Sequence, residues 1–433
     1  MRYLVNPAPL AGGSVTVPGD KSISHRALML GAIADGESVV AGFLQGEDCR
    51  ATLAALRAMG VQIDVVDRTT LRIKGAGMRG LAEPSSILDM GNSGTAMRLF
   101  SGLLSGQSFT TVLAGDESLM RRPMARVIAP LKQMGADIDS LDGLPPLTIR
   151  GGRRLTGIHY ALPIASAQVK SAILLAGLYA DGETSIIEPA PTRDHTERML
   201  KLLGVSLQAE NGRIRMPGRQ LVRSANIDVP ADLSSAAFVM LAAILAEDCD
   251  VRLPRVGMNP SRHGVVEILR RMGALIEIEN CTTQGFEPVA DVRVRSSGLR
   301  GTDVGPELVS LAIDEFPVLF VAAAAAEGET CFSGIGELRV KESDRISAMS
   351  DGLRRLGIAV EESGDGASVQ GGTFRGGVVD SHGDHRVAMS FAVAGTVAGG
   401  PVTVLNTDAV DTSFPGFVEC LRGIGADISA VRS

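Results

Sequence analysis

Basic side chains stand at the predicted start of several helices in this chain, in a pattern suited to binding anions. The stretch GDKSISHR (residues 19–26) places Lys21 and Arg26 on the first turns of a helix that opens with Asp and Ser. A helix start has free N–H groups and partial positive charge, so two added cations make a site for a phosphate or carboxylate group. Considered by itself, the stretch fits an N-cap followed by two solvated cations equally well.

The same design recurs at other predicted helix starts. The Gly-rich stretch GNSGTAMR (91–98) would let anionic oxygens approach the backbone closely. Each such stretch alone is a weak signal, because RVKESDR (339–345) also fits a solvated helix entry with weak local ion pairs. Five more cations nevertheless stand at comparable points, namely Arg122, Arg193, Lys341, Arg345 and Arg386.

Two carboxylates, Asp314 and Glu342, lie among these cations and are the candidates for acid–base chemistry. The whole chain is acidic, with a formal net charge of −7. A cationic cleft in an acidic protein attracts small polyanions. No zinc spacing, Walker loop or dinucleotide fingerprint is present in the sequence. The residues therefore indicate a cofactor-free transferase or isomerase that acts on phosphorylated or carboxylated small molecules.

The elements that must position these residues form a six-fold repeat. An amphipathic helix that ends in an apolar residue and a glycine, followed by a short strand, occurs six times, with the glycine at Gly60, Gly135, Gly204, Gly273, Gly357 and Gly425. A glycine after the last apolar residue predicts a left-handed helix end. A second helix of small and apolar residues also recurs, beginning near Lys21, Gly91, Ser166, Asp232, Asp314 and Asp384.

The small-residue helices lack a polar face, which predicts that they are buried inside an α/β protein with sheets outside. At 433 residues the chain is long for one core, so we expect two domains of three repeats each. The predicted domains are residues 20–229 and residues 1–19 plus 230–433, with crossings near 18–20 and 229–231. The strand within residues 2–17 precedes the first repeat and is expected to pair elsewhere. Coincidental glycine recurrence is the competing explanation.

Composition excludes several classes of protein. Aromatic residues make up 3% of the chain, with no Trp and no basic tract, which argues against nucleic-acid binding. The five scattered cysteines fit free thiols in a reducing compartment. The apolar runs at 236–246 and 317–326 are too short to span a bilayer, and no signal-peptide hydrophobic region opens the chain. We therefore expect a cytoplasmic protein without membrane or nucleic-acid partners.

Nine motifs, in order along essentially the whole chain, resemble the 5-enolpyruvylshikimate-3-phosphate synthase family. They are GDKSISHR (19–26), GNSGTAMR (91–98), RRPM (121–124), SAQVKSA (166–172), TRDHTE (192–197), MNPSR (258–262), RVKESDR (339–345), GDHRVAM (383–389) and TSFPGF (412–417). Three of them, SAQVK, RDHTE and MNPSR, are similar to the class II bacterial enzymes. The resemblance implies a two-domain inside-out α/β barrel in which each domain holds three βαβαββ repeats with buried helices.

The resemblance also implies a reaction. The enolpyruvyl (carboxyvinyl) group of phosphoenolpyruvate would pass to the 5-hydroxyl of shikimate 3-phosphate, releasing phosphate, on the shikimate pathway to chorismate and aromatic amino acids. Shikimate 3-phosphate would be held by Lys21, Ser22, Arg26, Ser166, Ala167, Gln168, Arg193, Asp314 and Lys341. Phosphoenolpyruvate would be held by Lys21, Gly94, Arg122, Gln168, Arg345 and Arg386.

The resemblance implies four catalytic residues, Lys21, Asp314, Lys341 and Glu342. Asp314 and Lys341 would flank the reacting hydroxyl, and Glu342 would handle the proton at the methylene carbon; which carboxylate is acid and which is base stays open. Charge neutralisation and alignment of two anionic substrates would supply much of the catalysis. Hinged closure of the domains would complete the site. The resemblance implies no cofactor and no metal, and we expect a monomer.

Two positions depart from a frequent family pattern. Ala167 stands where many members have Ser, and Thr412 stands where many have Lys; Lys170 is the one suggestion for a replacement cation. Gly94 resembles the form open to glyphosate, which makes the protein a candidate glyphosate target, whereas the class II motifs point toward tolerance. Sensitivity to glyphosate therefore stays open.

Two alternatives remain at this point. UDP-N-acetylglucosamine enolpyruvyl transferases share the fold and chemistry, but carry a reactive cysteine on a first-domain loop, and the corresponding loop near 112–122 has none here. A non-catalytic repeat scaffold would explain the periodicity but not the charged residues at the helix starts.

Overall fold

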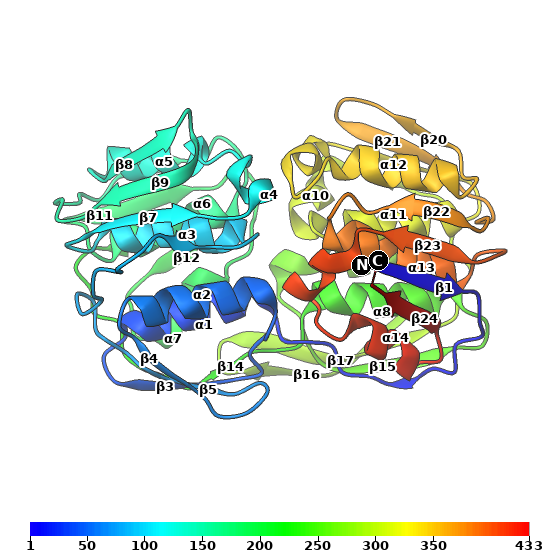
Figure 1. The fold of residues 1–433 in the computed structure, drawn as a ribbon, viewed down its shortest axis with the longest axis horizontal. Coiled ribbons are helices and arrows are strands. Elements are labelled where there is room, and N and C mark those ends of the chain that lie inside the picture. Colours follow the sequence, from blue (N-terminus) through cyan, green and yellow to red (C-terminus); the bar gives the residue numbers. More distant parts are fainter. Residues whose placement is uncertain (433) are drawn as a thin grey trace. The chain divides into compact units, whose positions relative to one another are not determined.

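The computed structural model describes residues 1–432, and within them the strands form six four-stranded sheets. In five sheets one edge strand is parallel to its neighbour and the remaining pairs are antiparallel. In the sixth, β2 is parallel to β15, and β15 is antiparallel to β17. This is the pattern expected of six βαβαββ repeats, and it confirms the predicted fold class (Figure 1).

The chain divides into two compact units. The first unit comprises Gly19–Val229 together with Gln284–Glu287; the second comprises Met1–Pro18, Pro230–Thr283 and the described residues from Pro288 on. The first unit holds the sheets β14-β3-β5-β4, β6-β7-β9-β8 and β10-β11-β13-β12, and the second holds β22-β23-β1-β24, β16-β17-β15-β2 and β18-β19-β21-β20.

The strands are short, as the repeat predicts. Those of the first unit are β3 (Glu37–Ala41), β4 (Gln62–Val65), β5 (Leu71–Lys74), β6 (Leu88–Asp89), β7 (Thr110–Ala114), β8 (Asp137–Leu141), β9 (Leu144–Arg150), β10 (His159–Ala161), β11 (Glu183–Ile187), β12 (Gln208–Glu210), β13 (Arg213–Pro217) and β14 (Ile227–Asp228). Those that open or build the second unit are β1 (Arg2–Asn6), β2 (Gly13–Ser14), β15 (Asp250–Gly257), β16 (Leu275–Gln284), β17 (Glu287–Arg295), β18 (Asp303–Val304), β19 (Glu329–Ser333), β20 (Val360–Glu362), β21 (Gly366–Gln370), β22 (Gly377–Asp380), β23 (Val402–Leu405) and β24 (Asp427–Val431).

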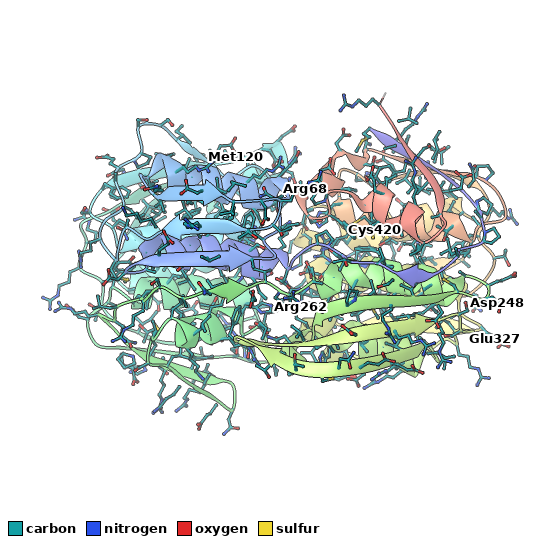
Figure 2. All side chains as sticks on the ribbon, turned by 90° about the horizontal axis from the view of Figure 1, so that it is seen from below. Arg68, Met120, Asp248, Arg262, Glu327 and Cys420 are labelled. Atoms are coloured by element: carbon teal, nitrogen blue, oxygen red, sulfur yellow. The ribbon has the colours of Figure 1, made fainter. Side chains whose placement is uncertain are left out.

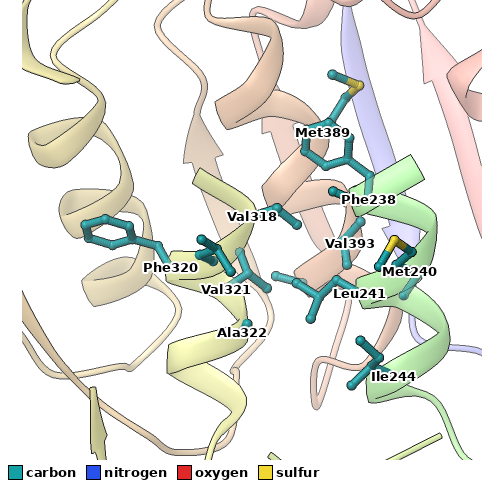
Figure 3. Close-up of a cluster of buried hydrophobic side chains, with 14 of the residues drawn as sticks. Phe238, Met240, Leu241, Ile244, Val318, Phe320, Val321, Ala322, Met389 and Val393 are labelled. Atoms are coloured by element: carbon teal, nitrogen blue, oxygen red, sulfur yellow. The ribbon is translucent and has the colours of Figure 1, made fainter. Parts of the chain in front are cut away.

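Six helices of small and apolar residues lie inside the units, close to their predicted positions. They are α1 (Lys21–Ile33), α3 (Gly94–Ser105), α6 (Ala167–Gly177), α8 (Leu233–Leu245), α11 (Phe316–Ala325) and α13 (His385–Thr396). Figure 3 shows how such helices pack in the second unit, where Leu241 of α8, Val321 of α11 and Val393 of α13 meet; all three are fully buried. The strands around them alternate buried and exposed side chains, so the sheets form the outside of each unit.

The amphipathic helices end at the predicted glycines. They are α2 (Glu47–Ala58), α5 (Ala125–Gln133), α7 (His195–Leu202), α9 (Gly264–Arg271), α12 (Arg345–Arg355) and α14 (Phe417–Gly423). The six glycines that follow them have φ between +82° and +104°, the left-handed region that disfavours a side chain. Short helices complete the chain: α4 (Glu117–Met120), α10 (Pro306–Ala312), and the 3-10 turns η1 (Pro260–Arg262), η2 (Gly336–Val340) and η3 (Thr407–Thr412).

The strand just before the first helix of one unit belongs to a sheet of the other unit. β2 precedes α1 but is parallel to β15, while β14 precedes α8 but is parallel to β3. β1 pairs antiparallel with both β23 and β24 of one sheet, and β2 is the edge strand of another, so the N-terminal segment contributes to two sheets of the second unit. This confirms that the segment pairs elsewhere than in the first repeat.

No described helix is both long and apolar enough to cross a membrane by itself, although the bent pair α10 and α11 passes that test of length and composition when taken together.

Candidate active site

In the first unit, helix α1 opens with the predicted cation Lys21. Asp20 caps the helix by accepting from the backbone N–H of Ile23 at 2.9 Å. The ammonium of Lys21 forms an ion pair with Asp48 of α2, a partner that the sequence motifs did not indicate. The pair holds a cation at the helix start, where the partial positive charge of the helix adds to its attraction for an anion.

Arg26 lies one turn further along α1 and is buried. Its guanidinium donates to Thr196 Oγ1 at 2.7 Å, to Ser171 Oγ at 2.8 Å and to the carbonyl of Ser22 at 2.8 Å. Burial lowers the pKa of Arg26 to about 10. Arg26 therefore joins α1 to α6 and α7, a structural task that comes in addition to the substrate contact expected of it.

The start of α3 brings two guanidinium groups close to the backbone of Gly94. A Cβ added at this residue would lie 2.9 Å from Arg98 Nη1 and 3.3 Å from Arg122 Nη1. Arg122 is oriented by Asn92, whose Oδ1 accepts from Nη2 at 2.6 Å and whose carbonyl accepts from Nη1 at 3.2 Å. A side chain at this position would therefore displace the guanidinium groups, and the motif GNSGTAMR builds a cationic helix entry.

Gln168, on the first turn of α6, is held with its amide in one orientation. Arg98 donates to Gln168 Oε1 at 2.6 Å, and Gln168 Nε2 donates to Thr95 Oγ1 at 2.9 Å. Ser166 caps the helix and Ala167 is its first residue. Sequence reasoning did not assign a role to Arg98, although its place within GNSGTAMR, four residues after Gly94, was the available signal.

Lys170 faces the interior of the first unit. Its ammonium is fully buried and lies 2.7 Å from Glu197 Oε1 and 3.0 Å from Glu188 Oε1, and it donates to the carbonyl of Thr192 at 3.4 Å. An ammonium committed to two carboxylates has no capacity for a substrate anion, so Lys170 gains no support as a replacement for a Lys at position 412. Thr412 is itself buried, and its hydroxyl donates to the carbonyl of Ala409 at 2.7 Å.

In the second unit, Arg345 is the centre of a group of carboxylates. Its guanidinium is 1% exposed and bonds to Asp384 Oδ2 at 2.8 Å and Glu342 Oε2 at 2.7 Å, with Asp314 Oδ1 at 3.6 Å from Nη1. Although burial opposes its charge, the three carboxylates raise the pKa of Arg345 above its ordinary value. Its Nη1 is buried and has no hydrogen-bond partner within residues 1–432.

Lys341 and Arg386 complete this group. Burial lowers the pKa of the Lys341 ammonium, against the attraction of the Asp314 carboxylate. Arg386 Nη1 donates to the backbone carbonyl of Asp314 at 2.9 Å, and Nη2 lies 3.9 Å from the Asp314 carboxylate. Asp314 is therefore in contact with Arg345 and Arg386, and its charge acts on the ammonium of Lys341.

Asp384 does two things that the sequence did not reveal. It is fully buried beside Arg345, and its Oδ1 caps α13 by accepting from the backbone N–H of Arg386 at 2.9 Å. A second group was also not predicted. Arg262 of η1, labelled in Figure 2, donates to Asp232 at 3.0 Å, and Glu315 accepts from Ser234 and lies 3.8 Å from Arg386 Nη1. The MNPSR motif contains Arg262, but its pairing with Asp232 is non-local.

The structure thus assembles two clusters, one in each unit. In the first unit, Arg98 and Arg122 lie close to Gly94 and Arg98 holds Gln168, while Lys21 stands at the start of α1 beside Asp48. The second cluster gathers Arg345, Arg386, Lys341, Asp314 and Glu342. Carboxylates pair with Lys21 in the first unit and with Arg345 and Arg386 in the second, whereas Arg122 is oriented by Asn92. Such an arrangement can bind anions and move protons. Among the described residues, no group of three or more His, Cys, Asp or Glu is placed to hold a metal ion.

Known proteins resemble this chain over its whole length. The family model described as EPSP synthase (3-phosphoshikimate 1-carboxyvinyltransferase) matches residues 6–421. A curated 3-phosphoshikimate 1-carboxyvinyltransferase from Coxiella burnetii is 54% identical over 433 residues, covering 100% of this chain and 99% of the relative. One from Methylococcus capsulatus is 56% identical over 427 residues, covering 98% of each chain. A solved EPSP synthase from Acinetobacter baumannii matches with a TM-score of 0.88 at 50% identity, covering 99% of this chain and 100% of that one.

These matches confirm the family indicated by the nine motifs and favour neither the nucleotide-sugar transferase nor the scaffold alternative. The chain therefore belongs to the EPSP synthase (3-phosphoshikimate 1-carboxyvinyltransferase) family.

Proposed function

We propose how the residues of the two clusters divide the work of the family reaction. The chain is a transferase of aromatic amino acid biosynthesis, using phosphoenolpyruvate and shikimate 3-phosphate as substrates. The carboxyvinyl group moves to the 5-hydroxyl of shikimate 3-phosphate, and phosphate leaves. Shikimate 3-phosphate is held by Lys21, Ser22, Arg26, Ser166, Ala167, Gln168, Arg193, Asp314 and Lys341, and phosphoenolpyruvate by Lys21, Gly94, Arg122, Gln168, Arg345 and Arg386.

One observation supports this assignment above the others. The guanidinium of Arg345 is buried among three carboxylates, yet its Nη1, 3.6 Å from Asp314 Oδ1, makes no hydrogen bond among the described residues. A buried donor without a partner costs free energy, which an anionic ligand would recover. A carboxylate or phosphate of phosphoenolpyruvate supplies the acceptor, and Arg386 adds a second cation close by.

The proton transfers follow from the groups around Arg345. Asp314 and Lys341 flank the hydroxyl that attacks, and Glu342 serves the methylene carbon that gains and later loses a proton. Protonation of that carbon makes C2 electrophilic, the hydroxyl adds to it, and the tetrahedral intermediate expels phosphate. The fixed cations stabilise the charge that develops on the way. Glu342 is itself oriented by its bond to Arg345, so one guanidinium positions both an acid–base group and the anion.

Phosphate release tests the proposal. Phosphoenolpyruvate is supplied with shikimate 3-phosphate or, separately, with UDP-N-acetylglucosamine. We expect release only with shikimate 3-phosphate, and a fall of about 100-fold or more for Asp314→Asn because a proton-transfer group is lost. The matched control is Asp351→Asn, the same change at an exposed residue of α12. Release with the nucleotide sugar, or unchanged activity of Asp314→Asn, contradicts the assignment.

Four further properties belong to the same proposal. The domains are proposed to be 20–229 and 1–19 plus 230–433, which differ from the two compact units in that Gly19 and Gln284–Glu287 belong to the first unit. The chain is proposed to act as a cytoplasmic monomer, and its phosphoenolpyruvate site to be a target of glyphosate.

A further inference from the structure

The tip of the β16–β17 hairpin is part of the first unit, although its two strands belong to the second. Phe286 is 8% exposed and belongs to the apolar core of the first unit, the same core that contains Met199 and Leu200 of α7. By contrast, Cys281, Thr282 and Thr283, just before the tip, are exposed. The tip is therefore docked through its own side chains rather than left in solvent.

Glu287 carries the most specific contact of this tip. Its Oε1 lies 2.6 Å from His195 Nδ1, and both side chains are almost fully buried. Arg198 adds two contacts: Nη1 donates to the carbonyl of Phe286 at 3.2 Å, and Nε lies 4.0 Å from Glu287 Oε2. The other ring nitrogen of His195 is buried without a hydrogen-bond partner within residues 1–432, so the Glu287 carboxylate fixes the ring.

The first turn of α7 is anchored at three successive residues, each to a different element. His195 is held by Glu287 of the hairpin, Thr196 accepts from Arg26 of α1, and Glu197 pairs with Lys170 of α6. Arg193 stands two residues before this turn, so its backbone is fixed by the same anchors. Thr196 also shares Arg26 with Ser171, which couples the turn to a second predicted ligand of shikimate 3-phosphate.

We propose that Glu287 is a positioning residue for shikimate 3-phosphate: through His195 it holds the first turn of α7, and with it Arg193 and Arg26, in the geometry that binds this substrate. The inference rests on the proposed roles of Arg193 and Arg26. Because binding and alignment of an anion depend on the placement of fixed cations, a small shift of the turn weakens binding. Phosphoenolpyruvate, assigned to other residues, is affected much less.

The experiment compares four forms of the full chain: wild type, Glu287→Ala, Glu287→Gln and Glu279→Ala. Glu279 lies on the same hairpin, in β16, and pairs on the surface with Arg252, so it controls for loss of a carboxylate from the hairpin. Calorimetry gives the Kd of shikimate 3-phosphate, and steady-state kinetics gives KM for each substrate. Glu287→Ala is expected to weaken shikimate 3-phosphate binding about tenfold or more, because a charged buried hydrogen bond is lost. Glu287→Gln, which can still accept from Nδ1, restores part of it, and Glu279→Ala matches wild type.

A double mutant separates positioning from general destabilisation. If Glu287 acts through Arg193 and Arg26, adding Glu287→Ala to Arg193→Ala costs less affinity than the same substitution costs the wild type, whereas independent effects multiply. Multiplying effects, an unchanged Kd for Glu287→Ala, or an equal rise in both KM values overturns the inference. If the wild type itself neither binds nor turns over shikimate 3-phosphate, the proposed function fails first, and that outcome is distinct because it is seen without any substitution.

Discussion

The buried pair of Arg345 and Asp384 should dominate the stability of the second unit's cluster. Asp384 is fully buried, pairs with Arg345 at 2.8 Å and caps α13. Removing one partner of a buried ion pair costs about 3–5 kcal/mol, because the other charge stays buried. In Asp384→Asn the single amide oxygen can keep the helix cap and the 3.4 Å contact with Arg345 Nη2, but the amide nitrogen then faces Nε, so the 2.8 Å bond is lost. Two carboxylates, Glu342 and Asp314, remain beside the guanidinium. We therefore expect a loss near the lower end of that range, about 3 kcal/mol.

A second substitution separates the two tasks of Asp384. In Asp384→Ala the cap is lost as well, which adds about 1 kcal/mol. The matched control is Asp344→Asn, at a residue that also caps a helix and pairs with an arginine, Arg339, but with the two side chains 39% and 27% exposed. Exposed pairs contribute little, so the control should lose less than about 1 kcal/mol.

Urea unfolding at constant m-value measures these differences, with the transitions of the two units fitted separately because a chain of two units need not unfold in one step. The reasoning is refuted if Asp344→Asn costs as much as Asp384→Asn, or if both Asp384 variants unfold like wild type. Activity gives an independent reading: loss of Asp384 frees Arg345 to move, and we expect a raised KM for phosphoenolpyruvate.

Two further predictions concern the clusters themselves. Gly94→Ala places a methyl group 2.9 Å from Arg98 Nη1 and 3.3 Å from Arg122 Nη1, so the guanidinium groups must shift. The KM for phosphoenolpyruvate should therefore rise about tenfold or more. The control is Gly298→Ala, where no atom lies within 4 Å of the added methyl group, and it should leave this KM unchanged. An equal KM in both variants would count against the assigned anion site. Burial lowers the pKa of the Lys341 ammonium. We expect the charged ammonium to be the active form, so kcat should fall as the pH rises through this lowered pKa rather than through the ordinary pKa of lysine. In Lys341→Arg the alkaline fall should move to higher pH, and an unmoved fall would assign it to another group.

Local patterns were sufficient to predict the repeating elements. The six glycines after the amphipathic helices needed no tertiary information, since a left-handed helix end is decided by the residue that occupies it. The buried helices were also predictable, because a helix without a polar face must lie inside. The position of charged residues at helix starts followed from the same local reasoning, and the motifs around them identified the family.

Long-range contacts decided what the sequence left open. β2 pairs with β15, and β14 pairs with β3, so each of these edge strands has a partner far away in the chain. No local pattern specifies such partners. Lys170 was suggested as a cation for the substrate, but its ammonium forms ion pairs with Glu188 and Glu197, because the fold brings α6, the end of β11 and α7 together. Arg98, likewise, acquires its role only when α3 packs beside α6.

The division between the two kinds of information has one physical cause. Helix ends, caps and buried faces depend on residues a few positions apart, so the sequence by itself determined the six repeats, their buried helices and the placement of cations at helix starts. The partners of a buried charge depend on which distant elements the core brings into contact. Only the tertiary structure therefore decided that Asp384 holds Arg345 and that the Glu287 hairpin tip fixes His195, since a charge removed from water must find its counter-charge wherever the fold supplies one.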